Sequence, residues 1–431
     1  MQQKKLAWVI SVDMGYGHQR AAYPFKDIAY QGIITANSSK ILTKKEKKTW
    51  RRMQAFYEGI SRFKSFPIIG KHLWNLYDKL QAISPIYPFR DLSKPSFESL
   101  YIHSLIKKGF LKSITEYTEQ KKLPFLTTFF ETAIAADYHK RENVYCIITD
   151  TDLHRVWVSN DPKLSNIVYF TPTHRATKRL QQYGVPKKNI VFTGFPLPKE
   201  NTGENMEILK VDLGARLINL DPNKKFISRS KKVIKADLKK NLIEKSTHPL
   251  TITFAIGGAG AQTEIVLVMI ESLKQKILDH KIRINLIAGT RPKTSQIFID
   301  KITELGLTKE VGSFINILCN VDRKKYFESF NDILHSTDIL WSKPSEICFY
   351  SGLGLPIIIA PPIGYHELRN QDWLIKMGSG INQEDPRYIN EWLFEWIDRG
   401  VLAQAAWEGY TEAPQKGTYN IEKILQKKVN S

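Results

Sequence analysis

A histidine behind a glycine-rich turn is the first residue whose type and position suit chemistry. Gly15 and Gly17 stand just before His18, and the turn follows an apolar run over residues 6–12, which we expect to form a buried strand. Because the imidazole pKa lies near neutrality, His18 is suited to general-base work or to orienting a bound group. A single histidine is more often structural, so the glycine turn before it is what favours a functional role.

Three carboxylates are the other candidates for proton transfer or metal binding in the first half of the chain. Asp13 ends the first apolar run, and we consider it as a partner that orients His18 or as the base itself. Asp150 and Asp152 follow a second apolar run over residues 143–149, and Asp150 is a further candidate base. Two carboxylates on one turn suit a hard divalent cation such as Mn²⁺. We nevertheless predict no metal site, because this pair is far in sequence from the second glycine-rich turn.

A second strand–glycine–helix pattern begins at residue 250. An apolar run over residues 250–256 leads into small residues, and residues 263–278 are expected to form a helix. Small residues let a diphosphate approach the main chain, and the amino end of the next helix favours its negative charge. An ordinary tight turn is the alternative explanation. The candidate residues are Gly257, Gly258, Ala259, Gly260 and Gln262.

The stretch from residue 338 to residue 370 has the pattern of a βαβ unit. Apolar strands are expected at residues 339–341 and 357–359, with a helix over residues 347–353 between them. In such units ligands bind beyond the carboxyl ends of the strands. The polar residues of the two loops at that edge are therefore candidates for binding: Lys343, Ser345, Glu346, Gly364, Glu367 and Asn370.

Short apolar strands, such as residues 190–192, alternate with helices, which are expected over residues 19–30, over residues 207–220 and over most of residues 44–130. This repeated alternation predicts an α/β fold with parallel sheets. We expect two Rossmann-like domains that face each other across a cleft, with a hinge at the Pro- and Gly-rich piece after residue 194. We expect residues 1–198 to form an N-terminal Rossmann-like domain with a helical, basic and aromatic insertion at about 35–140. Residues 199–249 are expected to be a hinge and lysine-rich segment. We expect residues 250–400 to form a C-terminal Rossmann-like domain and residues 401–431 to form C-terminal helices that pack back on the first domain.

The composition is that of a globular protein without disulfides. Of the 431 residues, 42% are hydrophobic and 11% aromatic, a balance that disordered chains do not have. The cysteines at positions 146, 319 and 348 show neither disulfide nor metal-ligand spacing, so we expect free thiols in a reducing compartment. The amino end lacks a signal-peptide pattern, and no apolar run reaches about 18 residues, which predicts a cytoplasmic protein.

The net charge of +20 concentrates in two segments. Residues 40–71 carry ten Lys and Arg among many aromatic residues, and residues 224–245 carry nine. Basic surfaces of this kind suit nucleic acid or an anionic membrane, and no nucleic-acid motif supports the first. For the aromatic part of the first segment two alternatives stay open, an ordinary core and a flap that contacts membranes. A merely solvated lysine-rich surface also explains the charge.

Several motifs, in order along the chain, resemble those of GT-B glycosyltransferases. TFAIGGAGAQ over residues 253–262, SKPSE over 342–346 and GLGLPIII over 352–359 are similar to motifs in the C-terminal half of that fold. GYGHQRAA over residues 15–22 and the block from 147 to 198 are similar to motifs in the N-terminal half. The resemblance is greatest to the group that contains monogalactosyldiacylglycerol synthases and the peptidoglycan N-acetylglucosaminyltransferase that acts on a lipid-linked acceptor.

The resemblance implies an inverting, metal-independent hexosyltransferase. It would use a nucleotide-sugar, UDP-linked by family, as co-substrate and need no other cofactor. It would act on a lipid or lipid-linked acceptor as a peripheral protein at the cytoplasmic membrane face, and no nucleic-acid partner is expected. The catalytic candidates are then His18, Asp13 and Asp150. The acceptor-side candidates are Gly15, Gly17 and Asp152, and a structural role is the alternative for the turn that holds Asp152. The candidates in the second half of the chain become donor-binding residues.

One position departs from the family pattern. The family's donor helix carries a glutamate seven residues before a proline, here Pro356, to hold ribose hydroxyls, and this chain has Phe349 there. We carry the ribose role over to Glu346, the role near the sugar to Glu367, and the role of its partner to Asn370. The departure keeps two other function classes open, a sugar-nucleotide epimerase or hydrolase of the same fold and a non-catalytic GT-B-like binding protein.

Overall fold

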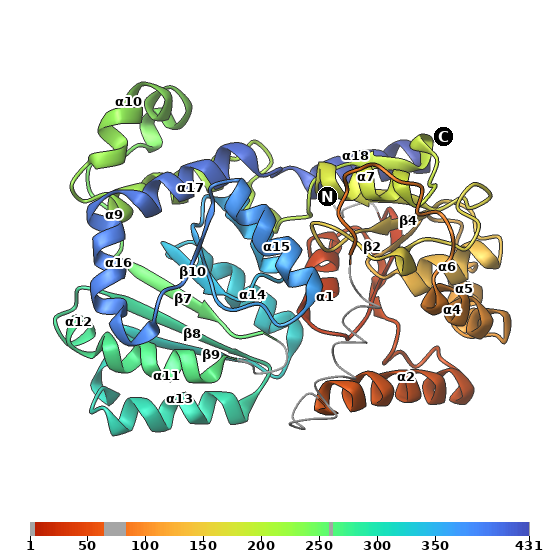
Figure 1. The fold of residues 1–431 in the computed structure, drawn as a ribbon, viewed down its shortest axis with the longest axis horizontal. Coiled ribbons are helices and arrows are strands. Elements are labelled where there is room, and N and C mark those ends of the chain that lie inside the picture. The colour runs from red at the N-terminus through yellow and green to blue at the C-terminus, as the bar shows by residue number, and fades with distance from the viewer. Residues whose placement is uncertain (1–4, 64–82, 258–261, 431) are drawn as a thin grey trace. The chain divides into compact units, whose positions relative to one another are not determined.

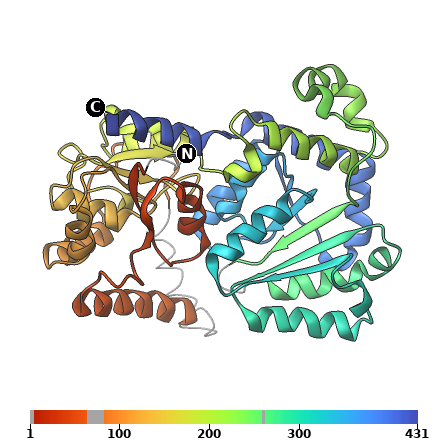
Figure 2. The ribbon, with the colours of Figure 1, turned by 180° about the vertical axis from the view of Figure 1, so that it is seen from behind.

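The polypeptide packs into two units, each built on its own parallel β-sheet. The structure is a computed structural model that describes residues 5–63, 83–257 and 262–430 (Figure 1). Unit 1 comprises residues up to Pro196, residues 364–369 and residues from Lys416 onward, and unit 2 comprises the rest. Helices lie on both sides of each sheet (Figure 2). The predicted α/β fold with two Rossmann-like units is therefore confirmed.

The sheet of unit 1 has six parallel strands in the order β2-β1-β3-β4-β5-β6. The chain leaves β1 in one direction to form β2 and returns on the other side of β1 to form β3, so the strand order reverses between β1 and β3. Most of these strands are buried apolar runs, as expected of parallel strands covered by helices. Their bounds are β1 Ala7–Ser11, β2 Ala29–Thr35, β3 Phe125–Thr127, β4 Val144–Ile147, β5 Val168–Thr171 and β6 Ile190–Phe192.

Some helices of unit 1 begin after a residue whose side chain caps the first turn. The Ser96 hydroxyl accepts from Ser99 N at the start of α4, and the Thr173 hydroxyl accepts from Ala176 N at the start of α7. The helices are α1 Tyr16–Ala22, η1 Tyr23–Phe25, α2 Lys44–Phe63, α4 Phe97–Lys107, α5 Lys112–Thr118, α6 Phe130–Tyr138, η2 Arg155–Trp157, α7 His174–Gln182, η3 Lys187–Asn189 and α18 Gly417–Asn430.

Two strands of unit 1 were not predicted from the sequence. The helix expected over residues 19–30 ends at Ala22, because a 3₁₀ turn containing Pro24 follows, and the edge strand β2 begins at Ala29. β3 interrupts the region predicted to be mostly helical over residues 44–130, and its three residues are too few to show a strand period. The aromatic residues 66–77 lie outside the described residues, so core and membrane flap both stay predictions there.

The sheet of unit 2 also has six parallel strands, in the order β12-β11-β10-β7-β8-β9. The order reverses between β7 and β10, which are neighbours with Ala255 paired to Ser342. The bounds are β7 Thr251–Ala255, β8 Arg283–Gly289, β9 Ile315–Cys319, β10 Ile339–Ser342, β11 Ile357–Ile359 and β12 Gly380–Asn382.

The helices of unit 2 include the whole segment that the sequence placed between the domains. Residues 199–249 hold three α-helices that belong to unit 2, and of the residues after 400, α17 belongs to unit 2 and α18 to unit 1. The helices are α8 Lys199–Thr202, α9 Glu207–Leu220, α10 Lys225–Leu238, η4 Lys239–Asn241, α11 Thr263–Ser272, α12 Lys274–Leu278, α13 Pro292–Glu304, η5 Thr308–Glu310, α14 Arg323–Leu334, η6 Glu346–Leu353, α15 Tyr365–Lys376, η7 Pro386–Tyr388, α16 Ile389–Asp398 and α17 Val401–Glu412.

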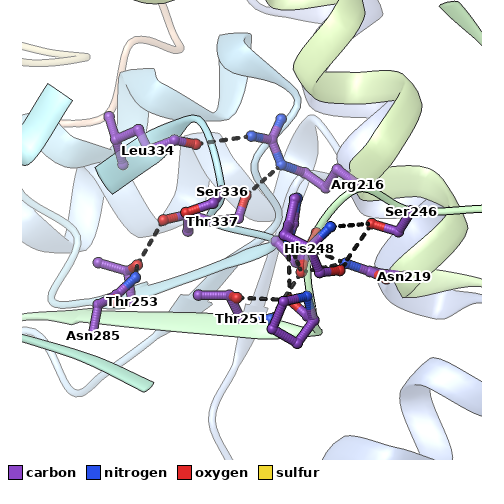
Figure 3. Close-up of polar contacts among 12 residues, drawn as sticks. Arg216, Asn219, Ser246, His248, Thr251, Thr253, Asn285, Leu334, Ser336 and Thr337 are labelled. Carbon is purple, nitrogen blue, oxygen red and sulfur yellow. Dashed lines mark hydrogen bonds and ion pairs between the residues drawn. The ribbon is translucent and has the colours of Figure 1, made fainter. Parts of the chain in front are cut away.

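A buried polar network holds α9 at the amino ends of β7 and β10 (Figure 3). The Arg216 guanidinium, 1% exposed, donates to the main-chain oxygens of Thr337 and Leu353, each at 2.7 Å. The Asp338 carboxylate accepts from Asn219 Nδ2 at 2.9 Å and from Thr251 N at 2.8 Å. These contacts hold the strands from one end and leave their carboxyl ends to the loops.

The three cysteines are free, with Cys146 and Cys348 buried and Cys319 half-buried. In the part of the chain that the structure describes, no helix is both long enough and apolar enough to cross a bilayer.

Candidate active site

In unit 1, the candidate residues gather where the strand order reverses. His18 lies in the helix that follows β1, and Thr128 directly follows β3, the neighbouring strand. The His18 Nδ1 atom is 2.6 Å from the Thr128 main-chain oxygen, which joins the two sides of the reversal. In doubly wound sheets ligands bind beyond the carboxyl ends of the strands at such a point. His18 is therefore placed where the fold favours a ligand.

The hydrogen bond to Thr128 decides which nitrogen of His18 can act as a base. A carbonyl oxygen only accepts, so Nδ1 carries the hydrogen and Nε2 carries the lone pair. Burial lowers the pKa of His18 below its ordinary value and, with the nearby His366, outweighs the opposing effects of the Thr128 carbonyl and the Asp150 carboxylate. The ring is thus neutral at pH 7, with Nε2 ready to accept a proton.

Two aromatic side chains hold the plane of the His18 ring. Phe129 meets it edge-on with ring centroids 5.0 Å apart, and Trp157 lies tilted at 6.1 Å. The sequence analysis missed Thr128, Phe129 and Trp157 as site residues. The signal for the first two was the short apolar run of β3, which lay inside a region predicted to be helical.

The loop after β1 is shaped by Asp13 and the glycines. The Asp13 main chain exchanges two hydrogen bonds with the Asn37 side chain, at 2.8 and 2.9 Å. Gly15 has φ of +95°, a conformation that other residues rarely adopt, and it precedes the first residue of α1. Gly17 lies in the first turn of that helix. These residues set the position from which His18 reaches Thr128.

Asp150 and Asp152 have different surroundings. Asp150 is half-buried and acts electrostatically on His18. The Asp152 carboxylate is fully buried and accepts four hydrogen bonds, from Leu153 N, from Arg175 Nε and from two nitrogens of Arg179. All of its lone-pair directions are thus used to bind α7 to the loop after β4. Of the two roles predicted for Asp152, this geometry supports the structural one.

In unit 2, the candidate donor residues gather at the equivalent reversal, between β7 and β10. The Ser342 hydroxyl at the end of β10 donates to Ala255 O at the end of β7, at 2.8 Å. The Lys343 side chain then lies across Gly257, where an added Cβ would collide with Lys343 Cε. Gly257 thus makes room for a cation at the switch point. Gly258, Ala259 and Gly260 lie outside the described residues, so their role stays a prediction.

Gln262 and the turn after β10 complete this edge. Gln262 precedes α11 with φ of +77°, and its Nε2 donates to Pro361 O at 3.0 Å, which ties the turn after β7 to the loop after β11. Ser345 N donates to Lys343 O at 2.8 Å, which tightens the turn before η6.

Glu346 and Phe349 lie in the short helix η6. Glu346 is its first residue and is 8% exposed. Phe349 is buried against Trp373, with ring centroids 5.3 Å apart. The position at which the resembled family carries a ribose-binding glutamate is therefore filled here by a packed aromatic ring.

Gly364, Glu367 and Asn370 belong to the start of α15. The Gly364 carbonyl accepts from Glu367 N at 3.0 Å, and the side chains of Glu367 and Asn370 are almost fully buried. Residues 364–369 pack with unit 1, whereas Asn370 packs with unit 2. The predicted donor residues are thus divided between the units, with Gly364 and Glu367 in the same unit as His18.

Among residues 5–63, 83–257 and 262–430, no three or more His, Cys, Asp and Glu side chains form a group that could hold a metal ion. The geometry described above offers proton transfer by His18 near a carboxylate, and anion binding near Gly257 and Lys343, as candidate chemistry.

Comparison with known proteins gives one relative in sequence and several in fold. No family model matches the chain. The chain is 21% identical over 287 residues to a processive diacylglycerol β-glucosyltransferase of Bacillus cytotoxicus, a match that covers 66% of this chain and 61% of that protein. The resemblance to GT-B glycosyltransferases that the motifs indicate is thus confirmed.

Two solved structures are similar along nearly their whole length. MurG of Acinetobacter baumannii is 13% identical with a TM-score of 0.48, over 98% of this chain and 99% of that one. The UDP-GlcNAc 2-epimerase of Neisseria meningitidis is 12% identical with a TM-score of 0.48, over 99% of this chain and 100% of that one.

Proposed function

We propose that this protein is a glycosyltransferase that moves a sugar from a nucleotide-sugar to a hydroxyl group of a lipid or lipid-linked acceptor. The observation that carries the proposal is the His18 geometry, a neutral imidazole whose Nδ1 is held by Thr128 and whose Nε2 lone pair lies at the strand switch point near Asp150. The sequence similarity to a diacylglycerol glucosyltransferase supports the class of donor and acceptor.

In this proposal the nucleotide part of the donor binds to unit 2. The ammonium of Lys343 and the main chain around Gly257 bind the diphosphate, and the amino end of α11, a helix of ten residues, favours its charge. Glu346 binds the ribose, and Glu367 and Asn370 orient the sugar. The nucleotide is UDP by family resemblance, and no metal or further cofactor takes part.

The transfer step follows from the His18 tautomer. Nε2 takes the proton from the acceptor hydroxyl while its oxygen forms a bond to the anomeric carbon. The bond from that carbon to the diphosphate breaks, and its electron pair leaves with the diphosphate. Asp150 stabilises the imidazolium that forms, as its effect on the His18 pKa indicates. Attack opposite the leaving group inverts the anomeric centre. The reaction takes place at the cytoplasmic face of a membrane, where a lipid acceptor is available.

A second candidate, a non-catalytic nucleotide or lipid-binding protein, is favoured by one observation. Phe349 is packed in the core where the resembled family holds ribose, so this chain lacks that contact with the donor. A protein of this kind would bind nucleotide-sugars weakly and turn none over.

The first test is a binding panel of UDP-, GDP-, ADP- and CDP-sugars, each with and without Mn²⁺, read by thermal shift and calorimetry. A ligand held only by the native state raises the free energy of unfolding by about 2.7 kcal/mol at a hundredfold excess over its Kd. We expect a UDP-sugar to bind without metal. Absence of binding by every member of the panel would contradict the proposal and favour the non-catalytic protein.

The second test offers the bound donor with vesicles that contain diacylglycerol. Transfer of labelled sugar to the lipid is the expected result. Consumption of the donor at the same rate without acceptor would instead indicate an epimerase or hydrolase, the remaining alternative.

A further inference from the structure

We propose that the lysine-rich outer face of α10 is a docking surface for an anionic lipid bilayer. The inference goes beyond the proposed reaction, because it rests on the charge, exposure and anchoring of one helix in unit 2 and uses no property of the candidate active site.

The inner face of α10 is already used for packing. Phe226, Ile227, Ile234 and Leu238 are all buried, and the helix contacts α9 and α17. In Figures 1 and 2 the opposite side of α10 points away from the rest of unit 2. The helix is therefore amphipathic, and its apolar side is already buried within unit 2. It need not insert into a membrane to bury that side.

The outer face of α10 carries a dense array of cations. The exposed cations of the helix and its flanks are Lys224, Lys225, Arg229, Lys231, Lys232, Lys235, Lys239 and Lys240. Within the helix, Lys225, Arg229 and Lys232 follow one another at four- and three-residue spacing and so share one side of it. Asp237, the helix's own acid, is engaged by Lys210 at 2.7 Å. Among the described residues, no acidic side chain forms an ion pair with any of the eight cations.

The array is held rigidly at its amino end. The buried Asp221 carboxylate accepts from the main-chain N–H groups of Lys225, Phe226 and Ile227, at 2.7, 2.9 and 2.7 Å. This cap fixes the first turn of the helix and satisfies donors that would otherwise lack partners. The cations are thus presented on an ordered helix, so docking costs little backbone entropy.

The chemistry of the face fits a bilayer better than a nucleic acid. Seven of the eight cations are lysines, which act as point charges, whereas recognition of phosphates by paired hydrogen bonds favours arginine. The uncharged residues of the outer face are Ser228, Val233 and Ala236, which cannot stack on bases as an aromatic ring does. Val233, 61% exposed, is suited to the headgroup region. Near an anionic surface each lysine strengthens binding about fivefold.

The test compares two quadruple variants of the full chain in vesicle sedimentation. The docking variant is Lys225→Gln, Lys232→Gln, Lys235→Gln and Lys239→Gln. The matched control is Lys274→Gln, Lys293→Gln, Lys309→Gln and Lys325→Gln, four exposed lysines elsewhere in unit 2. Both variants lose the same charge, and circular dichroism with thermal melting checks that both fold. The vesicles contain phosphatidylcholine alone or with phosphatidylglycerol, at low and moderate salt.

We expect the native protein to sediment with anionic vesicles and less so at moderate salt. The partition coefficient should fall at least about tenfold in the docking variant and less than about threefold in the control. Equal losses in both variants, unchanged binding of the docking variant, or no native binding at low salt would overturn the proposal. Tighter native binding to an RNA or DNA oligonucleotide than to vesicles, lost in the docking variant, would also overturn it in favour of nucleic acid. No donor is present, so failure here leaves the proposed transfer reaction untouched, and failure of the sugar panel leaves α10 untouched.

Discussion

The side chain of His18 can act as a base only while Nδ1 keeps its hydrogen bond to Thr128. Replacement of His18 by Gln keeps a polar side chain but removes the basic nitrogen. We expect His18→Gln to lower the turnover of the proposed reaction by at least about a hundredfold while the Kd of the nucleotide-sugar stays unchanged. Steady-state kinetics and calorimetry measure the two quantities.

The matched control for His18 is His280→Gln, a change at an exposed histidine stacked on Phe314. It should leave turnover unchanged. Because the pKa of His18 is lowered, the fall of kcat/KM at acid pH, where Nε2 is protonated, should have its midpoint below the ordinary imidazole value of 6.5. Burial has the largest effect on this pKa, and Asp150 and His366 are the titratable groups near the ring that also affect it. Full turnover in His18→Gln would remove the base from the proposal.

The burial of Glu131 predicts that its contribution to protein stability depends on pH. It lies in the first turn of α6, is 3% exposed, and its Oε2 has no hydrogen-bond partner among the described residues. Burial raises the pKa of Glu131 to about 8. The folded state therefore holds the proton more tightly than the unfolded state, and this contribution to stability is lost as the pH rises from about 4.5 to about 8.

Replacement of Glu131 by Gln removes this titration. We expect Glu131→Gln to exceed the native protein in free energy of unfolding by on the order of 2 kcal/mol at pH 8, with a difference that shrinks toward pH 4.5. Urea unfolding at several pH values measures the effect, and the exposed Glu116→Gln serves as control. A difference that does not change with pH would mean that Glu131 does not titrate in this range.

The sequence could identify His18 but not its partner. A glycine turn before a histidine is a local signal, whereas the contact with Thr128 joins residues 110 positions apart. Whether two such residues meet depends on which strands are neighbours, and β3 was itself too short to be recognised. In the same way, the acids of the Asp150–Asp152 turn look alike in sequence. Only the position of Arg179, on α7, shows that Asp152 is engaged structurally.

At the scale of elements, local patterns predicted most strands and most helices well. α9 and β6 have the bounds that the sequence indicated, because each is a run of one pattern closed by clear breaking residues. The edge strand β2 was missed, and the predicted helix 19–30 ran over its first two residues. Gln31 and Gly32 interrupt its apolar run, whereas β6, the other edge strand, is an unbroken run of three apolar residues.

The polar network at the amino ends of β7 and β10 predicts that Asp338→Asn and Asp338→Ala lower the free energy of unfolding by different amounts. Asp338 holds Thr251 N and Asn219 Nδ2, and burial raises its pKa to about 8, so it is largely neutral at pH 7. Asp338→Asn keeps an oxygen that accepts both hydrogen bonds, whereas Asp338→Ala leaves the buried Thr251 N–H unpaired and removes one of the acceptors of Asn219 Nδ2. We expect the alanine variant to lose about 2–3 kcal/mol in free energy of unfolding and the asparagine variant less than about 1 kcal/mol at pH 7.

Chemical denaturation at pH 7 measures both Asp338 variants, and Asp300→Ala on the exposed side of α13 is a suitable reference. Similar losses in Asp338→Asn and Asp338→Ala would show that the charge of Asp338, not its hydrogen bonds, holds α9 in place.

At the scale of the whole molecule, the two units should respond differently to a donor. The proposed diphosphate contacts lie at the ends of β7 and β10 in unit 2, so a UDP-sugar should slow hydrogen exchange most in residues 251–270 and 339–353. The amides of β4 and β5 in unit 1 are the internal reference. Exchange measured by mass spectrometry with and without the ligand gives the comparison. Protection confined to unit 1 would place the donor elsewhere than we propose.

The helix α18 belongs to unit 1 but is synthesised after the residues of unit 2. Residues 417–430 follow unit 2 in the chain, yet Ile421 and Leu425 are fully buried within unit 1, and Asn420 donates to Thr193 O at 2.9 Å. The ribosome therefore makes most of unit 1 first but supplies its last helix only after all of unit 2 has emerged. Until then, the apolar surface of unit 1 against which α18 packs stays uncovered. A chain cut short by a premature stop codon near position 416 would leave unit 1 with bare apolar surface and a strong tendency to aggregate.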